Sequence, residues 1–298
     1  MHQELFIAVI AGLAGMFGWG LADFFAKKTI DRIGDVQSLA WAGVFGSITF
    51  ALAALYQVVV RGGQLAIPHD AVTWLLLAFF GVLQAAVYLF AYNGFGKGQV
   101  ALLSPVFASF SGIVAIISIL FLHEATSPLR ILALVIMFLG ILLINLDINA
   151  FRERRIAFTR IPGFREVFAA TLLAALWTIL WYIFVNGKDW LAYSFYMFVF
   201  MTLGVFAMAK FRGLPMHIGE RSTWVLVALI GICETVAYLG ITLGYGATSL
   251  TSVVSLLSGA FSLPTIVLAY IFLKEKISSL QWFGCIVIVA GVTLLALV

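Results

Sequence analysis

Charged residues are scarce in this sequence. They account for 10% of its 298 residues, while hydrophobic residues account for 63%; soluble globular proteins carry about 25% charged residues. So few charges cannot cover the surface of a water-soluble globule of this length, which excludes a soluble enzyme or binding domain. The net charge of +4, spread along the chain, provides no dense basic face for nucleic acid. The composition indicates a protein embedded in a lipid bilayer.

Motifs for enzyme chemistry are also missing. Two cysteines, Cys233 and Cys285, are too few for a disulfide scaffold. The chain has no GxxxxGK[ST] loop, so we do not expect ATP to drive it directly. Its four histidines lie near predicted loops without metal-ligand spacing, and the apolar runs contain no Ser/His or paired-Asp arrangement. We therefore expect a protein that is not an enzyme and has no cofactor or metal.

Long apolar runs dominate the sequence. A bilayer core of about 30 Å needs roughly 20 consecutive apolar residues per helix. We therefore predict an all-α membrane protein with ten transmembrane helices. The predicted spans are residues 5–26, 37–60, 72–93, 99–122, 129–146, 166–186, 190–209, 223–244, 250–273 and 281–297.

Basic residues gather in the loops on one side. Of the 17 Lys and Arg residues, 14 follow odd-numbered spans, and the other side holds Arg61, Arg130 and Lys188. Because cytoplasmic loops carry an excess of Lys and Arg, the charge-rich side is predicted to be cytoplasmic and both termini to lie outside. We expect an integral protein of a prokaryotic inner (cytoplasmic) membrane.

The two halves of the sequence are related. Residues 81–96 align without a gap on residues 231–246, and the similarity continues, after a shift of one residue, for about 65 residues in all. Matched pairs include Gly81 and Gly231, Gln84 and Glu234, Tyr88 and Tyr238, Gly94 and Gly244, Phe110 and Phe261, and Gly140 and Gly291.

An odd number of spans per half fixes how the halves are related. Two five-span halves joined end to end must have opposite orientations, which is the inverted-repeat architecture of many secondary transporters. We predict a first five-helix repeat at 1–147, a basic linker at 148–165 and a second repeat at 166–298, surrounding a central cavity. Gly12, Gly15, Gly18 and Gly20 lie within an apolar helix, so we interpret them as small-residue helix packing and not as a nucleotide fingerprint.

The sequence resembles a known family. The Gly- and Trp-rich segments "GMFGWGLADFF" and "AALWTILWYIF", the two repeats, and an acidic residue closing spans four and nine are similar to the EamA type of the drug/metabolite transporter superfamily. The resemblance implies a transporter, and usually implies cytoplasmic termini, contrary to the charge distribution. The segment "GWGLADFFAKK" also resembles the sugar-porter branch, so uptake stays open beside export.

These observations predict a secondary active transporter working by alternating access. Its expected substrates are small polar or amphipathic metabolites. The first hypothesis is export of amino acids or similar metabolites, either coupled to protons or by facilitated diffusion. A sugar or nucleotide-sugar uptake carrier of the same fold is the alternative. A non-transporting membrane enzyme or scaffold is a further alternative. The expected partners are the substrate and the lipid bilayer, without nucleic acid; the sequence does not give the oligomeric state.

Glu234 is the most informative candidate site residue. It lies at the centre of the eighth predicted span, where an acid costs about 2.5–3.5 kcal/mol on insertion scales and normally faces a wet cavity or a partner. We predict a substrate or proton-coupling site. The structural alternative is a protonated acid hydrogen-bonded to a neighbouring helix, for example to Gln84.

The other candidate site residues carry aromatic or amide side chains. Gln84 and Tyr88 recur as Glu234 and Tyr238, each pair four residues apart and so on one helix face. Either these side chains line a substrate cavity or the tyrosines pack locally between helices. Trp19, Trp177 and Trp181 lie nearer the middle of their spans than tryptophan usually does. They are predicted to contact substrate or to gate it, with helix packing as the alternative.

Three further features concern the ends and interruptions of spans. Asp23 precedes Lys27 by one helical turn, which predicts either an ion pair at the cytoplasmic edge or a gate. Pro264 interrupts span nine and is the candidate hinge. Glu124 and Glu275 are predicted to be solvated acids that order tight turns.

Overall fold

The computed structural model describes residues 2–97, 100–146, 162–274 and 276–297. All regular structure in these ranges is helical, which confirms the predicted fold class. Most of the predicted linker, 148–165, lies outside the described residues. The helices are α1 (His2–Ile33), α2 (Asp35–Val59), α3 (Ala71–Lys97), α4 (Val100–Ala108), α5 (Phe110–Phe121), α6 (Pro128–Asn145), α8 (Phe164–Val185), α9 (Trp190–Phe211), α10 (Arg221–Ala247), α11 (Thr251–Gly259), α12 (Ser262–Leu273) and α13 (Ser279–Ala296).

The lengths of these helices agree with a membrane-spanning bundle. Within the described ranges, nine helical segments are long and apolar enough to cross a bilayer, and Ser279–Leu295 is a shorter apolar helix at the position of the tenth predicted span. Large apolar side chains such as Phe6, Leu75 and Ile286 are exposed on the outside. A surface of this kind is suited to lipid, because soluble proteins rarely expose large continuous apolar areas.

The fourth and ninth spans are not continuous helices. Span four is divided into α4 and α5 at Ser109, and span nine into α11 and α12 at Ala260 and Phe261. The two breaks lie at matching places in the repeats, because Phe110 is the counterpart of Phe261. Discontinuous helices leave backbone groups free near the middle of the membrane, and such groups are tolerated only within protein or beside a cavity.

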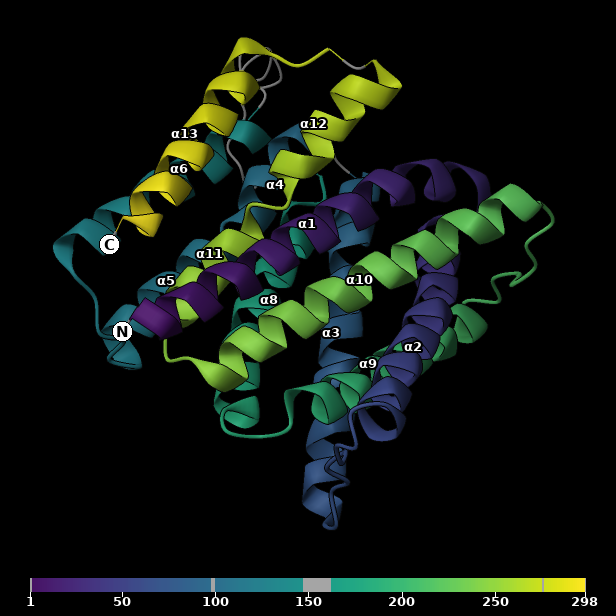
Figure 1. Cartoon of the computed structure of the whole chain (residues 1–298). Coiled ribbons are helices and arrows are strands. Elements are labelled where there is room, and N and C mark those ends of the chain that lie inside the picture. Colours follow the sequence, from purple (N-terminus) through teal and green to yellow (C-terminus); the bar gives the residue numbers. More distant parts are fainter. Residues whose placement is uncertain (1, 98–99, 147–161, 275, 298) are drawn as a thin grey trace.

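Helices of one repeat pack against helices of the other. Helix α1 lies along α10, and α6 lies along α13 (Figure 1). A Cβ on Gly81 of α3 would lie 2.6 Å from the backbone nitrogen of Met201 in α9, and a Cβ on Gly231 of α10 would lie 2.4 Å from the carbonyl oxygen of Ala42 in α2. The matched glycines therefore make matching close approaches to the opposite repeat.

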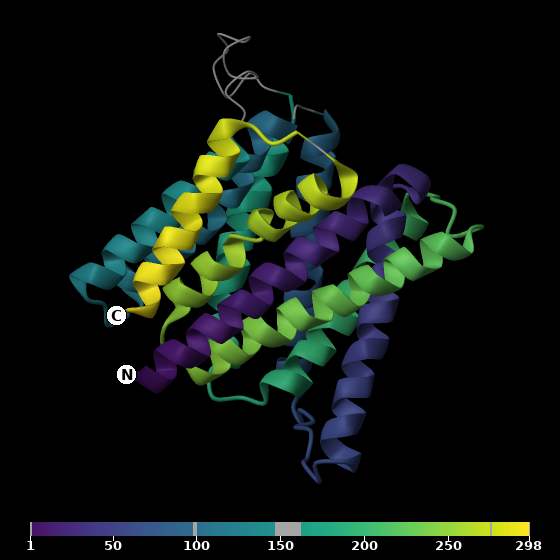
Figure 2. The same ribbon diagram turned by 45° about the horizontal axis from the view of Figure 1, so that its top comes forward.

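The glycines of α1 have the predicted packing role. A Cβ on any of them would come within 2.7 Å of an atom of α10, α11 or α12, as the distances at Gly12, Gly15, Gly18 and Gly20 show. The first residues of α1 and the last residues of α13 lie on the same side of the bundle (Figure 2). We call this side the terminal face, and the side at which α1, α3 and α6 end the basic face.

Candidate functional site

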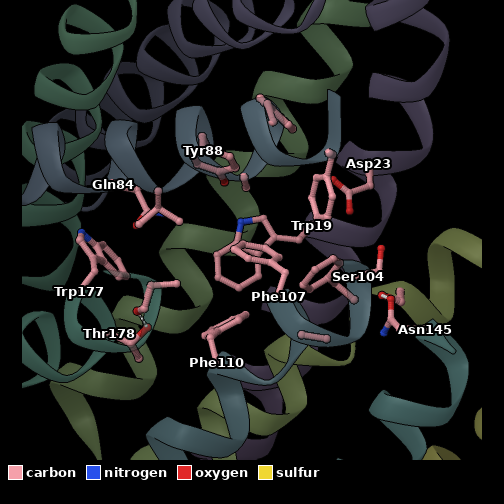
Figure 3. A pocket seen from close by; sticks show the side chains of 18 of the residues that line it. Trp19, Asp23, Gln84, Tyr88, Ser104, Phe107, Phe110, Asn145, Trp177 and Thr178 are labelled. Atoms are coloured by element: carbon pink, nitrogen blue, oxygen red, sulfur yellow. Dashed lines mark hydrogen bonds between the residues drawn. The ribbon is translucent and has the colours of Figure 1, made fainter. Parts of the chain in front are cut away.

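A cavity of about 280 Å³ lies between the two repeats. It is mainly aromatic, with a few polar side chains (Figure 3). The aromatic lining consists of Trp19, Tyr88, Tyr92, Phe95, Phe107, Phe110, Trp177 and Phe261. The polar lining consists of Asp23, Gln84, Ser104, Asn145, Thr178, Glu234 and Ser262. No three His, Cys, Asp or Glu side chains among the described residues are grouped to hold a metal ion.

Glu234 lies at the midpoint of α10 and faces this cavity. Its side chain is buried, and its Oε2 accepts hydrogen bonds from Trp19 Nε1 at 3.1 Å and from the Tyr88 hydroxyl at 3.2 Å. These donors belong to α1 and α3, so both partners come from the first repeat. The carboxyl group is hydrogen-bonded to neighbouring helices, as the structural interpretation expects. It also lines the cavity, as the interpretation as a substrate or proton site expects. Its geometry keeps it away from lipid.

The repeat-related pair Gln84 and Tyr88 also lines the cavity. The Tyr88 hydroxyl lies 3.4 Å from that of Tyr238, and the Tyr238 hydroxyl donates to Met201 Sδ at 3.8 Å. Tyr238 is fully buried and is not among the lining residues, so it contacts lining residues such as Tyr88 without reaching the cavity itself. Gln84 is 7% exposed, and its Oε1 has no hydrogen-bond partner among the described residues.

The predicted tryptophans divide into two groups. Trp19 and Trp177 line the cavity, and Trp177 Nε1 donates to the carbonyl oxygen of Phe80 at 3.0 Å. Trp181 stacks on Trp177 with ring centroids 5.5 Å apart. It is fully buried and is not part of the lining, and its Nε1 donates to Thr242 Oγ1 at 3.1 Å. Trp181 therefore packs beneath the site in this structure.

Asp23 lies on the cavity side of α1. Its side chain is exposed to the cavity and also borders a small adjoining pocket that contains Tyr92. The α1 helix extends a further ten residues beyond Asp23 to Ile33, and the ion pair or gate at the cytoplasmic edge remains a prediction. The carboxyl group thus shares the lining of both pockets with Glu234.

Pro264 lies in the first turn of α12, three residues after Phe261. The helix interruption precedes it, and its missing N–H is at a position where a helix has no internal acceptor for one. A Cβ on Gly20 would lie 2.3 Å from Pro264 Cγ, and Thr265 Oγ1 donates to the carbonyl oxygen of Gly20 at 2.9 Å. Pro264 is thus packed tightly against α1, next to the helix break.

Sequence reasoning missed part of the lining. Asn145 is the last residue of α6; its Nδ2 donates to the carbonyl oxygen of Ile141, and its Oδ1 accepts from Ser262 Oγ at 3.2 Å. Ser104 and Phe107 belong to α4 and also face the cavity (Figure 3). The match of Phe110 with Phe261 could have indicated the helix breaks, but nothing local in the sequence distinguishes Asn145 from a helix-ending residue.

The cavity extends toward one face only. Apart from Trp177 and Thr178, which lie past the middle of α8, the lining residues lie near the middle of their predicted spans or toward the basic face, as far as Phe95 near the end of α3 and Asn145 at the end of α6. Toward the terminal face the space between the repeats is filled by buried side chains, including Trp181, Tyr245 and Leu257. The structure is therefore asymmetric although its repeats match.

Glu124 differs from the sequence-based expectation. The prediction of a solvated acid is wrong, because Glu124 is 7% exposed. Its Oε2 accepts a hydrogen bond from the backbone nitrogen of Ser252 at 2.8 Å, and its Oε1 accepts one from the Ser252 hydroxyl. Burial raises the pKa of the Glu124 carboxyl above its usual value. Glu124 thus caps α11 of the opposite repeat on the terminal face, while Glu275 lies outside the described residues.

The two halves of the chain match one family model. The EamA-like transporter family matches residues 6–146 and again residues 165–297. The chain belongs to the EamA-like transporter family. A solved structure entitled "Crystal structure of protein" aligns with this EamA-like chain at a TM-score of 0.77 and 16% identity, covering 97% of each chain. No curated protein matches the chain. The solved structure shows the fold, and the family establishes a membrane transporter architecture for small molecules.

Proposed function

We propose that this EamA-like protein is a secondary transporter that moves small polar or amphipathic metabolites by alternating access. The observation that carries the proposal is the central cavity, which both repeats build and in which Glu234 is held at the midpoint of α10. Sites near the midplane between inverted repeats are typical of secondary transporters. Amino acids and related compounds, moved in the export direction, are the first class to test.

The same carboxyl group supports proton coupling. Trp19 and Tyr88 donate to Glu234, so its carboxyl group is held in place by two hydrogen bonds. Intramembrane acids that face a cavity commonly relay protons. We infer that Glu234 exchanges a proton with one compartment and interacts with substrate when the cavity faces the other.

We infer from the asymmetry of the cavity which compartment this conformation faces. The space opens toward the basic face, which the distribution of Lys and Arg predicts to be cytoplasmic. In that orientation the structure is a cytoplasm-facing state in a prokaryotic inner membrane, ready to receive a solute for export. Opening the terminal face would require the repeats, proposed as 1–147 and 166–298, to rock against each other. The helix breaks beside Pro264 and Ser109 are the proposed hinges.

The proposal is tested by flux in proteoliposomes. Wild-type protein is expected to couple movement of a solute from an amino-acid panel to proton movement, recorded by a pH-sensitive dye inside the vesicles. Glu234→Gln keeps the size of the side chain but cannot exchange a proton, so coupled flux and its pH dependence should be lost. Glu4→Gln, at an exposed acid near the N-terminus, is the matched control and should behave as wild type. Unchanged pH-dependent flux in Glu234→Gln would rule out the coupling role.

A further inference from the structure

A buried polar cluster lies between the repeats on the terminal face. At its centre Glu124 accepts hydrogen bonds from the backbone nitrogen and the hydroxyl of Ser252, in the first turn of α11. The Ser118 carbonyl oxygen accepts from the Glu124 backbone nitrogen at 3.2 Å. Arg130, in the first turn of α6, is 5% exposed, and its positive charge stabilises the Glu124 carboxylate. Thr251 directly precedes Ser252, and we call these five residues the terminal cluster.

Three polar atoms of the terminal cluster are unpaired. Ser118 Oγ, Arg130 Nε and Thr251 Oγ1 are buried without a hydrogen-bond partner among the described residues, where only five such side-chain atoms occur. Native proteins keep few unpaired buried polar atoms, because each one is costly. Water would supply the missing partners if the terminal face opened. The cluster therefore holds this face shut less firmly than an apolar seal of the same shape would.

The other repeat lacks this cluster. The repeat alignment that pairs Phe110 with Phe261 gives the four polar side chains around Glu124 three apolar counterparts and one glutamine, namely Ala269 for Ser118, Gln281 for Arg130, Val100 for Thr251 and Ala101 for Ser252. The fold of a repeat thus does not require polar side chains at these positions. The cluster belongs to the terminal face specifically, and this is the face that is closed in the structure.

The cluster lies where the repeats must separate if this face opens. Glu124 belongs to the first repeat and Ser252 to the second, and the helices that carry them, α5 and α11, pack against each other (Figure 1). Between the cluster and the central cavity lie fully buried side chains, including Trp181 and Thr242, which are hydrogen-bonded to each other at 3.1 Å. Water reaches them from the terminal side only if the contact between Glu124 and Ser252 is broken.

We propose that the terminal cluster is the gate of the terminal face. The hydrogen bonds from Ser252 to Glu124 hold it shut, and the unpaired polar atoms lower the cost of opening it, because they gain hydrogen bonds to water when the repeats separate. The proposal rests on the proposed function, since alternating access requires this face to open. It implies that two substitutions act in opposite directions. Loss of the Glu124 carboxylate favours the open state, whereas loss of an unpaired hydroxyl favours the closed one.

Opening is measured by the reactivity of a buried cysteine in the purified full-length protein in lipid nanodiscs. The reporter is Thr242→Cys, in a background in which Cys233 and Cys285 are replaced by alanine, and the probe is a charged, membrane-impermeant maleimide. Because Thr242 is fully buried, the labelling rate reports how often the terminal face opens. A second reporter, Thr171→Cys, is buried in the half of α8 nearer the basic face. It should react slowly in every variant, and it detects global unfolding.

The variants test the two opposite effects. Glu124→Ala should raise the labelling rate at Thr242→Cys about tenfold, since a hydrogen bond to a charged group is worth roughly that factor. Thr251→Val keeps the shape of the side chain without the unpaired hydroxyl and should lower the rate about fivefold. Thr49→Val is the matched control, because its hydroxyl donates to the Phe45 carbonyl oxygen within α2, and it should leave the rate unchanged.

Three results would overturn the gate. These are a labelling rate in Thr251→Val that equals or exceeds the wild-type rate, an unchanged rate in Glu124→Ala, and a rise in Glu124→Ala that the Thr171→Cys reporter shares. Thr251→Val alone decides the question if Glu124→Ala does not fold.

Failure of this inference can be distinguished from failure of the proposed function, because labelling needs no solute. The expected labelling changes without flux in proteoliposomes would support the gate and contradict the transporter. Proton-coupled flux in the wild-type protein, with labelling that neither substitution changes, would support the transporter and contradict the gate.

Discussion

The contact between Glu124 and Ser252 provides a quantitative test of how the repeats are joined on the terminal face. Leu250 stands at the N-cap of α11, where its side chain cannot accept a hydrogen bond. Glu124 supplies that acceptor from the turn after α5, through the Ser252 backbone nitrogen at 2.8 Å and the Ser252 hydroxyl. Loss of an N-cap acceptor costs about 1 kcal/mol, and an unpaired buried donor about 1–3 kcal/mol. We therefore expect Glu124→Ala to lower the free energy of unfolding by about 2–3 kcal/mol.

A double-mutant cycle with Ser252→Ala isolates the contact. Ser252→Ala removes the hydroxyl but keeps the backbone donor, so a coupling energy of about 1 kcal/mol is expected between the two positions. The free energy of unfolding is measured in detergent micelles by denaturant titration. Glu4→Ala, at an exposed acid, is the control and should change stability by less than about 0.5 kcal/mol. Additive effects of Glu124→Ala and Ser252→Ala would refute the inferred cap.

Two further predictions concern titration and helix packing. Because burial raises the pKa of Glu124, the folded protein holds this proton more tightly than the unfolded chain. The resulting stabilisation is complete below the usual Glu pKa and is lost as pH rises through the folded-state pKa. Glu124→Gln cannot titrate, so its unfolding temperature should fall less with pH across that window; parallel curves would contradict this explanation. Gly231→Ala would place a Cβ 2.4 Å from the Ala42 carbonyl oxygen and should lower the free energy of unfolding, measured by denaturant titration, by about 1–3 kcal/mol. Gly204→Ala is the control: its Cβ would have Ala85 Cβ as its nearest contact, at 3.4 Å, and the free energy of unfolding should hardly change. Similar losses in the two glycine variants would show that the close approach is not the cause.

Much of the architecture follows from composition and periodicity. Apolar runs of about 20 residues predict helices of spanning length because the bilayer core fixes that length. The match of Gly81 with Gly231 was visible in the sequence, and both glycines make close approaches to the opposite repeat. Glu234 could be singled out because an acid in the middle of an apolar run needs a partner or a cavity.

The parts that could not be predicted depend on contacts between distant segments. Glu124 and Ser252 are 128 residues apart, so no local pattern reveals that one caps the other. The contribution of Asn145 likewise depends on where α6 ends relative to α12. Trp177 and Trp181 are one helical turn apart, yet only Trp177 lines the cavity, because the space closes toward the terminal face between them.

The position of Trp181 has a consequence for the two ends of the transport path. When Trp19 is matched with Trp177, Asp23 is matched with Trp181, and the repeat alignment pairs Tyr92 with Thr242. Asp23 and Tyr92 line the cavity, whereas Trp181 and Thr242 lie outside its lining and are hydrogen-bonded to each other. If each repeat adopts the conformation of the other, the cavity opens toward the terminal face. A solute then meets the indole of Trp181 and the hydroxyl of Thr242 on that side, in place of the carboxyl group of Asp23 and the phenol of Tyr92. Two ends of such different chemistry would give the two faces of the protein different affinities for the same solute, whereas the gradients across the membrane set the direction of net movement.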